Sequence, residues 1–85
     1  MNRDPRQTPQ PQPALGRALR ELRRKRDETQ EELARRAGIT AKTLSLIERG
    51  EANPTWGTVR GIAAALGVSM GEVAKLADEF VAAEK

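Results

Sequence analysis

Two short helices joined by a glycine-containing turn are predicted between Thr29 and Gly50, and no other segment constrains the fold as much. Thr29 precedes Glu32 by three residues, the spacing of a capping box, in which each side chain bonds the other residue's backbone amide. Gly38 follows the last apolar position of this helix and can adopt the positive φ that ends one. Thr40 can cap a second helix that ends at Gly50. Because the turn is so short, the two helices cross at a steep angle and the second projects from the domain.

A further helix is predicted before this pair. Leu15, Ala18, Leu19 and Leu22 lie three or four positions apart, which places them on one face of a helix. Pro13 suits the first turn of that helix, where a backbone amide donor is not needed. The pattern predicts a helix from Pro13 to about residue 26.

Two more helices are predicted after the pair. Thr55 can cap a fourth helix that ends at about Leu66, before a glycine. Ser69 and Glu72 form a second capping box, which starts a fifth helix from Met70 to about residue 82. The chain's single tryptophan follows the apolar spacing of the fourth helix, so we place it in the core, with a role as an anchor for a partner as the alternative. The expected buried face of the fourth helix consists of Trp56, Val59, Ile62, Ala63 and Leu66.

The chain of 85 residues has room for one small domain. Residues 1–13 contain four prolines and several glutamines, and Met1 is their only apolar side chain, which predicts a disordered arm. Aromatic residues make up only 2% of the chain, so a core must be built from small aliphatic side chains. We therefore expect an all-α fold, with residues 14–82 as its single domain and the helix pair at residues 29–50.

Several classes of function are disfavoured by residue types that the chain lacks. It has no cysteine and no histidine, so the usual zinc ligands are missing, and we expect no metal and no cofactor. Ser45 and Ser69 have no histidine to activate them as nucleophiles, which argues against an enzyme. No apolar run is long enough for a membrane span, and a cytoplasmic protein without membrane contact is expected.

Charge is distributed unevenly along the chain. Up to Arg60 there are 13 lysines and arginines against 8 acidic residues, whereas beyond it there are 2 against 4. A basic surface attracts the phosphate backbone of nucleic acids. The excess of positive charge therefore lies in the part of the chain that contains the helix pair.

The run TQEELARRAGIT, followed by LSLIERG, NPT and IAAALGVS, resembles the helix-turn-helix domain of the phage Cro and lambda-repressor type, the Xre family. The resemblance covers roughly Leu15 to Leu76. It implies a five-helix lambda-repressor-like domain that binds double-stranded DNA as a homodimer, with the second helix of the pair in the major groove.

The candidate base-reading residues lie on the outward face of the second helix of the pair. Burying Leu44 and Ile47 turns the opposite side toward DNA. Lysine and serine can donate to base edges, and alanine or leucine can contact a thymine methyl group. Few side chains on this face can make two hydrogen bonds to one base, so DNA shape and bridging water would contribute to specificity. The expected base-reading residues are Ala41, Lys42, Ser45 and Leu46.

Candidate phosphate contacts surround the same helix. Gln30 opens the first helix of the pair, where free amides and the helix dipole favour an anion. Thr43 lies at the edge of the reading face. The family resemblance adds the residues around the loop that follows the second helix. The expected phosphate-binding residues are Gln30, Thr43, Arg49, Asn53 and Thr55.

The resemblance also implies two structural contacts. In the family, an arginine near the end of the first helix pairs with the glutamate of the closing motif, and Arg23 and Glu48 occupy the matching positions. In the family, residues after the second helix of the pair and on the fifth helix commonly build a symmetric dimer, and the apolar stripe of the fifth helix continues past the turns needed to cover the first helix. The dimer interface is accordingly expected at Leu76, Phe80 and Val81.

The function expected from this reading is a sequence-specific transcriptional regulator that binds a two-fold operator as a homodimer, with residues 40–49 in the major groove. An antitoxin with a protein partner and a restriction-modification controller remain open within the same fold. A helical adaptor that binds protein but not DNA is the alternative from another class.

Overall fold

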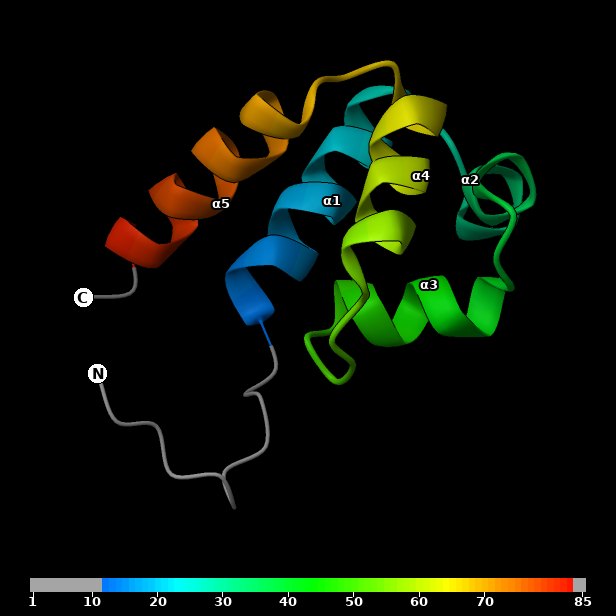
Figure 1. The fold of residues 1–85 in the computed structure, drawn as a ribbon, viewed down its shortest axis with the longest axis horizontal. Helices are drawn as coiled ribbons and strands as arrows, with labels where there is room; N and C mark the ends of the chain where they lie inside the picture. Colours follow the sequence, from blue (N-terminus) through cyan, green and yellow to red (C-terminus); the bar gives the residue numbers. More distant parts are fainter. Residues whose placement is uncertain (1–11, 84–85) are drawn as a thin grey trace.

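The computed structural model describes residues 12–83 and folds them into five helices (Figure 1). Residues 1–11, which make up most of the predicted arm, lie outside the described part. The expected all-α class is confirmed. The helices match the predicted bounds to within one residue, except that the third helix ends at Glu48, two residues before the predicted Gly50. They are α1 (Pro13–Lys25), α2 (Gln30–Ala37), α3 (Ala41–Glu48), α4 (Trp56–Leu66) and α5 (Met70–Ala83).

Helix α1 is the centre of the packing. It contacts α5, α3 and α4, while α2 packs against α4 and α3. Figure 1 shows α5 lying along α1 on one side and α3 crossing at the other end of the molecule. The core is aliphatic throughout, because the chain has so few aromatic residues. Its fully buried larger side chains are Leu19, Leu33, Leu44, Ile47, Ile62, Leu66 and Val73.

The predicted helix starts are confirmed by their hydrogen bonds. The backbone amide of Glu32 donates to the Thr29 hydroxyl at 3.1 Å, and the Thr29 amide donates to the Glu32 carboxylate at 2.9 Å. Ser69 and Glu72 make the same reciprocal pair. Gly38 ends α2 with a φ of 77°. This left-handed conformation is unfavourable for residues that carry a side chain, so glycine suits the position. Local sequence therefore determines where these helices begin and end.

Helices α1 and α3 approach each other closely at a glycine. A Cβ atom added to Gly16 would overlap the carbonyl oxygen of Ile47 and lie 2.8 Å from that of Glu48. Both neighbours are backbone atoms, which cannot rotate away as a side chain would. The absent side chain at Gly16 thus sets the distance between the central helix and α3.

The turn between α1 and α2 is held by arginines. The Glu28 carboxylate lies 3.1 Å from Nε of Arg26 and 2.6 Å from the guanidinium of Arg36. Its backbone carbonyl accepts a hydrogen bond from Arg23 at 2.7 Å. Asp27, in the same turn, has a φ of 60°, in the left-handed region where aspartate is tolerated better than most residues. The polar contacts of Glu28 thus position α2 relative to α1.

The placement of Trp56 in the core is wrong. Its side chain is 68% exposed, whereas Val59, Ile62, Ala63 and Leu66 of the same helix are buried as predicted. Trp56 is the first residue of α4. Helical spacing gives the direction of a side chain but does not show whether a neighbouring element reaches far enough to cover it, and here none does.

No helix in residues 12–83 is long and apolar enough to cross a membrane.

Candidate DNA-binding site

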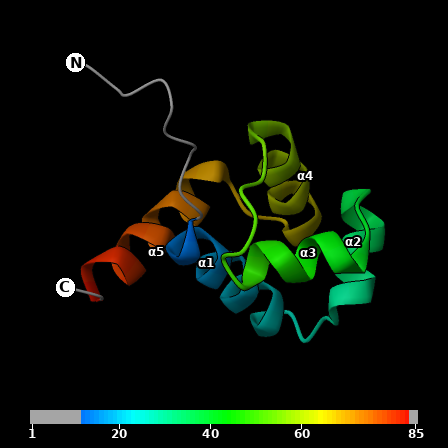
Figure 2. The ribbon, with the colours of Figure 1, turned by 90° about the horizontal axis from the view of Figure 1, so that it is seen from below.

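Helix α3 lies across one face of the molecule, where Figure 2 shows it in full view with α2 beside it. Leu44 and Ile47 are buried, as the predicted orientation requires. Lys42 is exposed, and Ser45 and Leu46 are half-buried. These three residues are thus at the surface on the outward side of the helix.

Ala41 is less accessible than predicted. It is half-buried and packs in part against the hydrophobic core. It is the first residue of α3 and follows the turn from α2 directly. Its methyl group is therefore shared between the core and the outward face.

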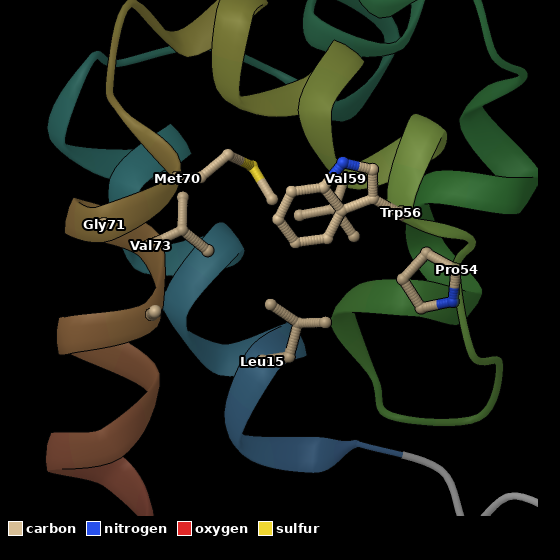
Figure 3. A pocket seen from close by; sticks show the side chains of 8 residues that line it. Leu15, Pro54, Trp56, Val59, Met70, Gly71 and Val73 are labelled. Carbon is tan, nitrogen blue, oxygen red and sulfur yellow. The ribbon is translucent and has the colours of Figure 1, made fainter.

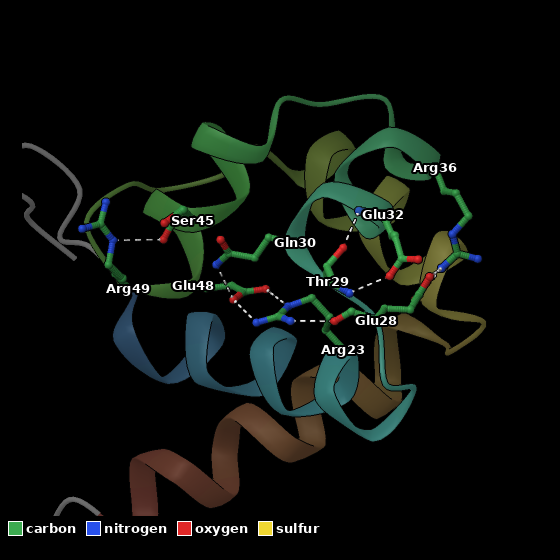
Figure 4. A network of polar contacts seen from close by, with 9 residues as sticks. All are labelled: Arg23, Glu28, Thr29, Gln30, Glu32, Arg36, Ser45, Glu48 and Arg49. Carbon is green, nitrogen blue, oxygen red and sulfur yellow. Dashed lines mark hydrogen bonds and ion pairs between the residues drawn. The ribbon is translucent and has the colours of Figure 1, made fainter.

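A polar network fixes α3 to the body of the domain (Figure 4). The guanidinium of Arg23 donates to both carboxylate oxygens of Glu48, through Nε at 2.7 Å and through the second terminal nitrogen at 3.0 Å. Gln30 donates from its side-chain amide to the same carboxylate at 3.0 Å. The ion pair expected between Arg23 and Glu48 is present, and Gln30 joins it. One carboxylate thereby connects the central helix, the start of α2 and the end of α3.

The charged groups of this network are buried, so each of them needs a partner. The Glu48 side chain is 1% exposed and that of Arg23 is 12% exposed. The hydrogen bond to Glu48 raises the pKa of Arg23 above its ordinary value, against the lowering effect of burial. A buried charge without partners is costly, but no buried side-chain nitrogen or oxygen in the described residues lacks a hydrogen bond. The network is thus fully satisfied.

A polar hollow of about 200 Å³ lies beside this network, between α1, α2 and α3. Arg20, Arg23 and Gln30 line it together with Ser45, Glu48 and Arg49. Arg23 neutralises the Glu48 carboxylate, so the exposed guanidinium groups of Arg20 and Arg49 give the hollow a positive character. Its position next to Ser45 places it at the edge of the outward face of α3.

Arg20 was not among the residues singled out from the sequence. The signal that could have found it is its spacing: it precedes Arg23 by three residues and therefore lies on the same side of α1. The expected phosphate contacts lie on the helix pair and in the loop that follows it, whereas Arg20 belongs to α1, which packs directly against α3.

The other expected phosphate contacts are at the surface. Thr43 and Asn53 are exposed. Arg49 is exposed and lies 3.5 Å from Glu51. Thr55 has a second role, because its hydroxyl accepts a hydrogen bond from the backbone amide of Thr58 and caps α4. These residues lie in α3 and in the loop that follows it, close to one another along the chain.

The residues expected to form a dimer interface differ in environment. Val81 is 44% exposed, whereas Leu76 and Phe80 are half-buried. The guanidinium of Arg17 lies 4.2 Å from the centre of the Phe80 ring, a cation–π contact between α1 and α5. Phe80 thus has a partner within its own chain.

Comparison with known proteins identifies the arrangement. Residues 14–76 match the family model described as a helix-turn-helix domain. The chain belongs to the helix-turn-helix family. The resemblance to Xre-type regulators is therefore confirmed, and membership of this family makes the protein a DNA-binding regulator of transcription.

Individual relatives of this helix-turn-helix protein agree with that assignment. It is 43% identical over 65 residues to the uncharacterized HTH-type transcriptional regulator y4dJ of Sinorhizobium fredii, covering 76% of this chain and 84% of the relative. Its fold is similar to that of the clp gene regulator ClgR from Corynebacterium glutamicum, with a TM-score of 0.84 and 32% identity over 89% of this chain and 83% of the other. The restriction-modification controller protein C.AhdI from Aeromonas hydrophila is also similar, with a TM-score of 0.70 and 31% identity over 72% and 92% of the two chains.

Proposed function

We propose that the protein regulates transcription as a homodimer that binds a two-fold DNA operator, with α3 of each copy in a major groove. The observation that carries this proposal is the two-sided character of α3. One side is fixed to α1 through the buried Glu48 carboxylate, while Lys42 and Ser45 face outward. A helix held rigidly on one side and polar on the other is the arrangement that major-groove recognition needs.

The site would make two kinds of contact with DNA. Lys42 would donate to guanine O6 or N7, and Ser45 to a neighbouring base edge. Gln30, Arg49 and the newly located Arg20 would bind phosphate oxygens around the polar hollow, which positions the protein without reading sequence. The hydrogen bond from Gln30 to Glu48 orients its side-chain amide before DNA arrives. Preorganised donors lose less conformational entropy on binding.

Direct readout by this face would be modest. Lysine acts as a point charge, and a serine hydroxyl accepts or donates to several bases, so neither selects a base as strongly as a side chain with two fixed hydrogen bonds. Shape and deformability of the operator, together with the spacing of two half-sites, would then supply much of the specificity.

Binding to a duplex of arbitrary sequence across a salt series tests the proposal. We expect measurable affinity at low salt and a linear fall of log K with log salt concentration, with a slope of about −0.9 per phosphate contact. A fluorescently labelled 20-base-pair duplex and anisotropy detection suffice. Absence of binding at low salt would contradict the proposal and favour a helical adaptor that contacts protein.

A restriction-modification controller is the second candidate, favoured by the similarity to C.AhdI over 92% of that chain. In this role the protein would bind specific DNA, and the DNA beside its own gene is the first sequence to test. Binding of the purified protein to the DNA that flanks its own gene, set against its binding to a shuffled duplex, tests this role. Equal affinity for the two duplexes would contradict it.

A further inference from the structure

The two ends of α1 lie in different surroundings. At its first turn, Leu15 and Trp56 line an open apolar groove of about 530 Å³ (Figure 3). At its other end, where the chain turns toward α2, the carboxylate of Glu28 lies between Arg26 and Arg36. Charged contacts therefore hold the end of α1 that leads into the proposed DNA-binding helix pair.

The Glu28 carboxylate connects α2 to two other helices. Glu28 directly precedes Thr29, the N-cap of α2, and lies 2.6 Å from the guanidinium of Arg36 in the last turn of that helix. It lies 3.1 Å from Nε of Arg26, which caps the end of α1. Arg26 also donates to the backbone carbonyl oxygen of Leu66, the last residue of α4, at 3.3 Å. The Glu28 side chain is only 15% exposed, so water and salt screen these contacts less than at an open surface.

The backbone of Glu28 belongs to the buried network of α3 (Figure 4). Its carbonyl oxygen accepts a hydrogen bond from Arg23 at 2.7 Å, and the same guanidinium binds Glu48. Two residues after Glu28, the side-chain amide of Gln30 donates to Glu48 at 3.0 Å. The short segment from residue 28 to residue 30 is thus held between an ionic cluster and a buried network, and both influence where Gln30 lies.

We propose that Glu28 is a positioning residue for DNA binding, whose carboxylate holds the start of α2 so that the side-chain amide of Gln30 meets a DNA phosphate. The proposal rests on the function proposed above, in which Gln30 binds phosphate. In a helix with a capping box, the residue before the N-cap often makes an apolar contact with the fourth helical residue, which here is Leu33. A carboxylate does not supply that contact, and the two arginine contacts of Glu28 take its place. A donor that is fixed before DNA arrives loses less conformational entropy on binding.

An opposing account gives Glu28 only its charge. A carboxylate near a DNA-binding surface repels phosphate, so its removal would strengthen binding. A positioning role predicts the opposite sign, because loss of the carboxylate releases the start of α2 although the net charge of the protein becomes more positive. The direction of the change in affinity therefore separates the two accounts.

Two neighbouring carboxylates provide a matched pair of variants. Glu28→Gln removes the charge of the cluster with little change in shape. Asp27→Asn removes the same charge from an exposed side chain one residue earlier, and asparagine tolerates the φ of 60° at that position. We expect E28Q to weaken binding to the 20-base-pair duplex by about threefold to tenfold, the worth of one hydrogen bond, and D27N to bind as tightly as wild type or more tightly. Binding by E28Q that equals or exceeds that of wild type would overturn the proposal.

A double-mutant cycle separates positioning from a general effect on the fold. All proteins are compared well below their unfolding temperatures, with equal helix content by circular dichroism. If Glu28 acts through Gln30, E28Q should cost little further affinity in a protein that already carries Gln30→Ala. The same fold-loss in the Q30A protein as in wild type would overturn the proposal.

The wild-type measurement keeps this role apart from the proposed function. If wild type binds the duplex and E28Q binds it equally well, only the role of Glu28 is contradicted. If wild type binds no duplex at low salt, the proposed function is contradicted, and the role of Glu28 with it.

Discussion

Arg23 and Glu48, separated by 25 positions in the chain, face each other through two hydrogen bonds of 2.7 and 3.0 Å in the interior. The pair joins α1 to the last residue of α3. Its geometry is that of two parallel bonds between a planar guanidinium and a carboxylate, which gives directional as well as electrostatic specificity. The pair thereby sets the orientation of α3 on the domain.

Removing one partner of this pair should be strongly destabilising. Arg23→Ala leaves the buried Glu48 carboxylate with Gln30 as its remaining side-chain donor, and we expect unfolding free energy to fall by about 3–5 kcal/mol. Urea denaturation measures this loss. In the double variant with Glu48→Ala the loss should be smaller than the sum of the two single losses, because the unpaired charge is gone. Additive losses would show that the two residues do not interact.

A matched pair of glycines tests the packing of α1 on α3. Gly16→Ala forces a methyl group against the backbone of α3, and we expect a loss of about 1–3 kcal/mol. Gly57→Ala is the control, because its added Cβ would meet only the Thr55 hydroxyl at 3.9 Å. There the better helix propensity of alanine should stabilise by about 0.5–1 kcal/mol. Thermal unfolding of both variants would show opposite shifts, and a stabilised G16A would contradict the close approach.

Base-reading and phosphate contacts should differ in their dependence on DNA sequence. Lys42→Ala should relax the preference at one operator position by about 1–3 kcal/mol, whereas Gln30→Ala should weaken binding to all sequences alike. Competition with operator variants that differ at single positions measures this. If K42A loses the same affinity on all duplexes, Lys42 contacts phosphate and does not read a base. Because Gln30 also bonds Glu48, the stability of Q30A is measured in parallel.

Arg20 should contribute to DNA affinity through charge. Arg20→Gln removes a cation from the rim of the polar hollow, so binding should weaken and the salt slope should fall by about 0.9. Arg24→Gln is the control, because it removes the same charge one turn further along α1, at a residue that does not line the hollow. Identical slopes for R20Q and R24Q would contradict a phosphate contact at Arg20.

The capping box of α2 should make part of the stability depend on pH. The backbone amide of Thr29 donates to Glu32 and, with the side-chain contact, lowers the pKa of this carboxyl below its ordinary value of 4.5. A lowered pKa in the folded state means that the unfolded state binds the proton first, so the contribution is complete above pH 4.5 and is lost as pH falls through the folded value. Glu32→Gln keeps an acceptor but cannot titrate. Urea denaturation from neutral to acidic pH should show wild type and E32Q converging at low pH, and a constant difference would contradict this account.

Helix bounds were predictable because their causes are local. A threonine or serine, a glutamate three residues later and a closing glycine lie within one or two turns of each other, and the observed bonds at Thr29 and Ser69 are those that the spacing predicts. The pairing of Arg23 with Glu48 was predictable only through the family resemblance, since no local pattern connects residues 25 positions apart. The role of Gly16 and the position of Arg20 beside α3 were not predicted, because both depend on how two helices meet.

Trp56 shows most clearly what the sequence determines and what the tertiary structure decides. The sequence by itself determined five helices, their caps and the apolar faces of α1 to α5, because capping and helical periodicity act over a few residues. Only the tertiary structure decided which apolar side chains are covered. Burial requires a neighbour that reaches the same point in space, and the crossing of α1, α4 and α5 leaves the first turn of α4 uncovered. That geometry converts an expected core residue into the wall of an open groove.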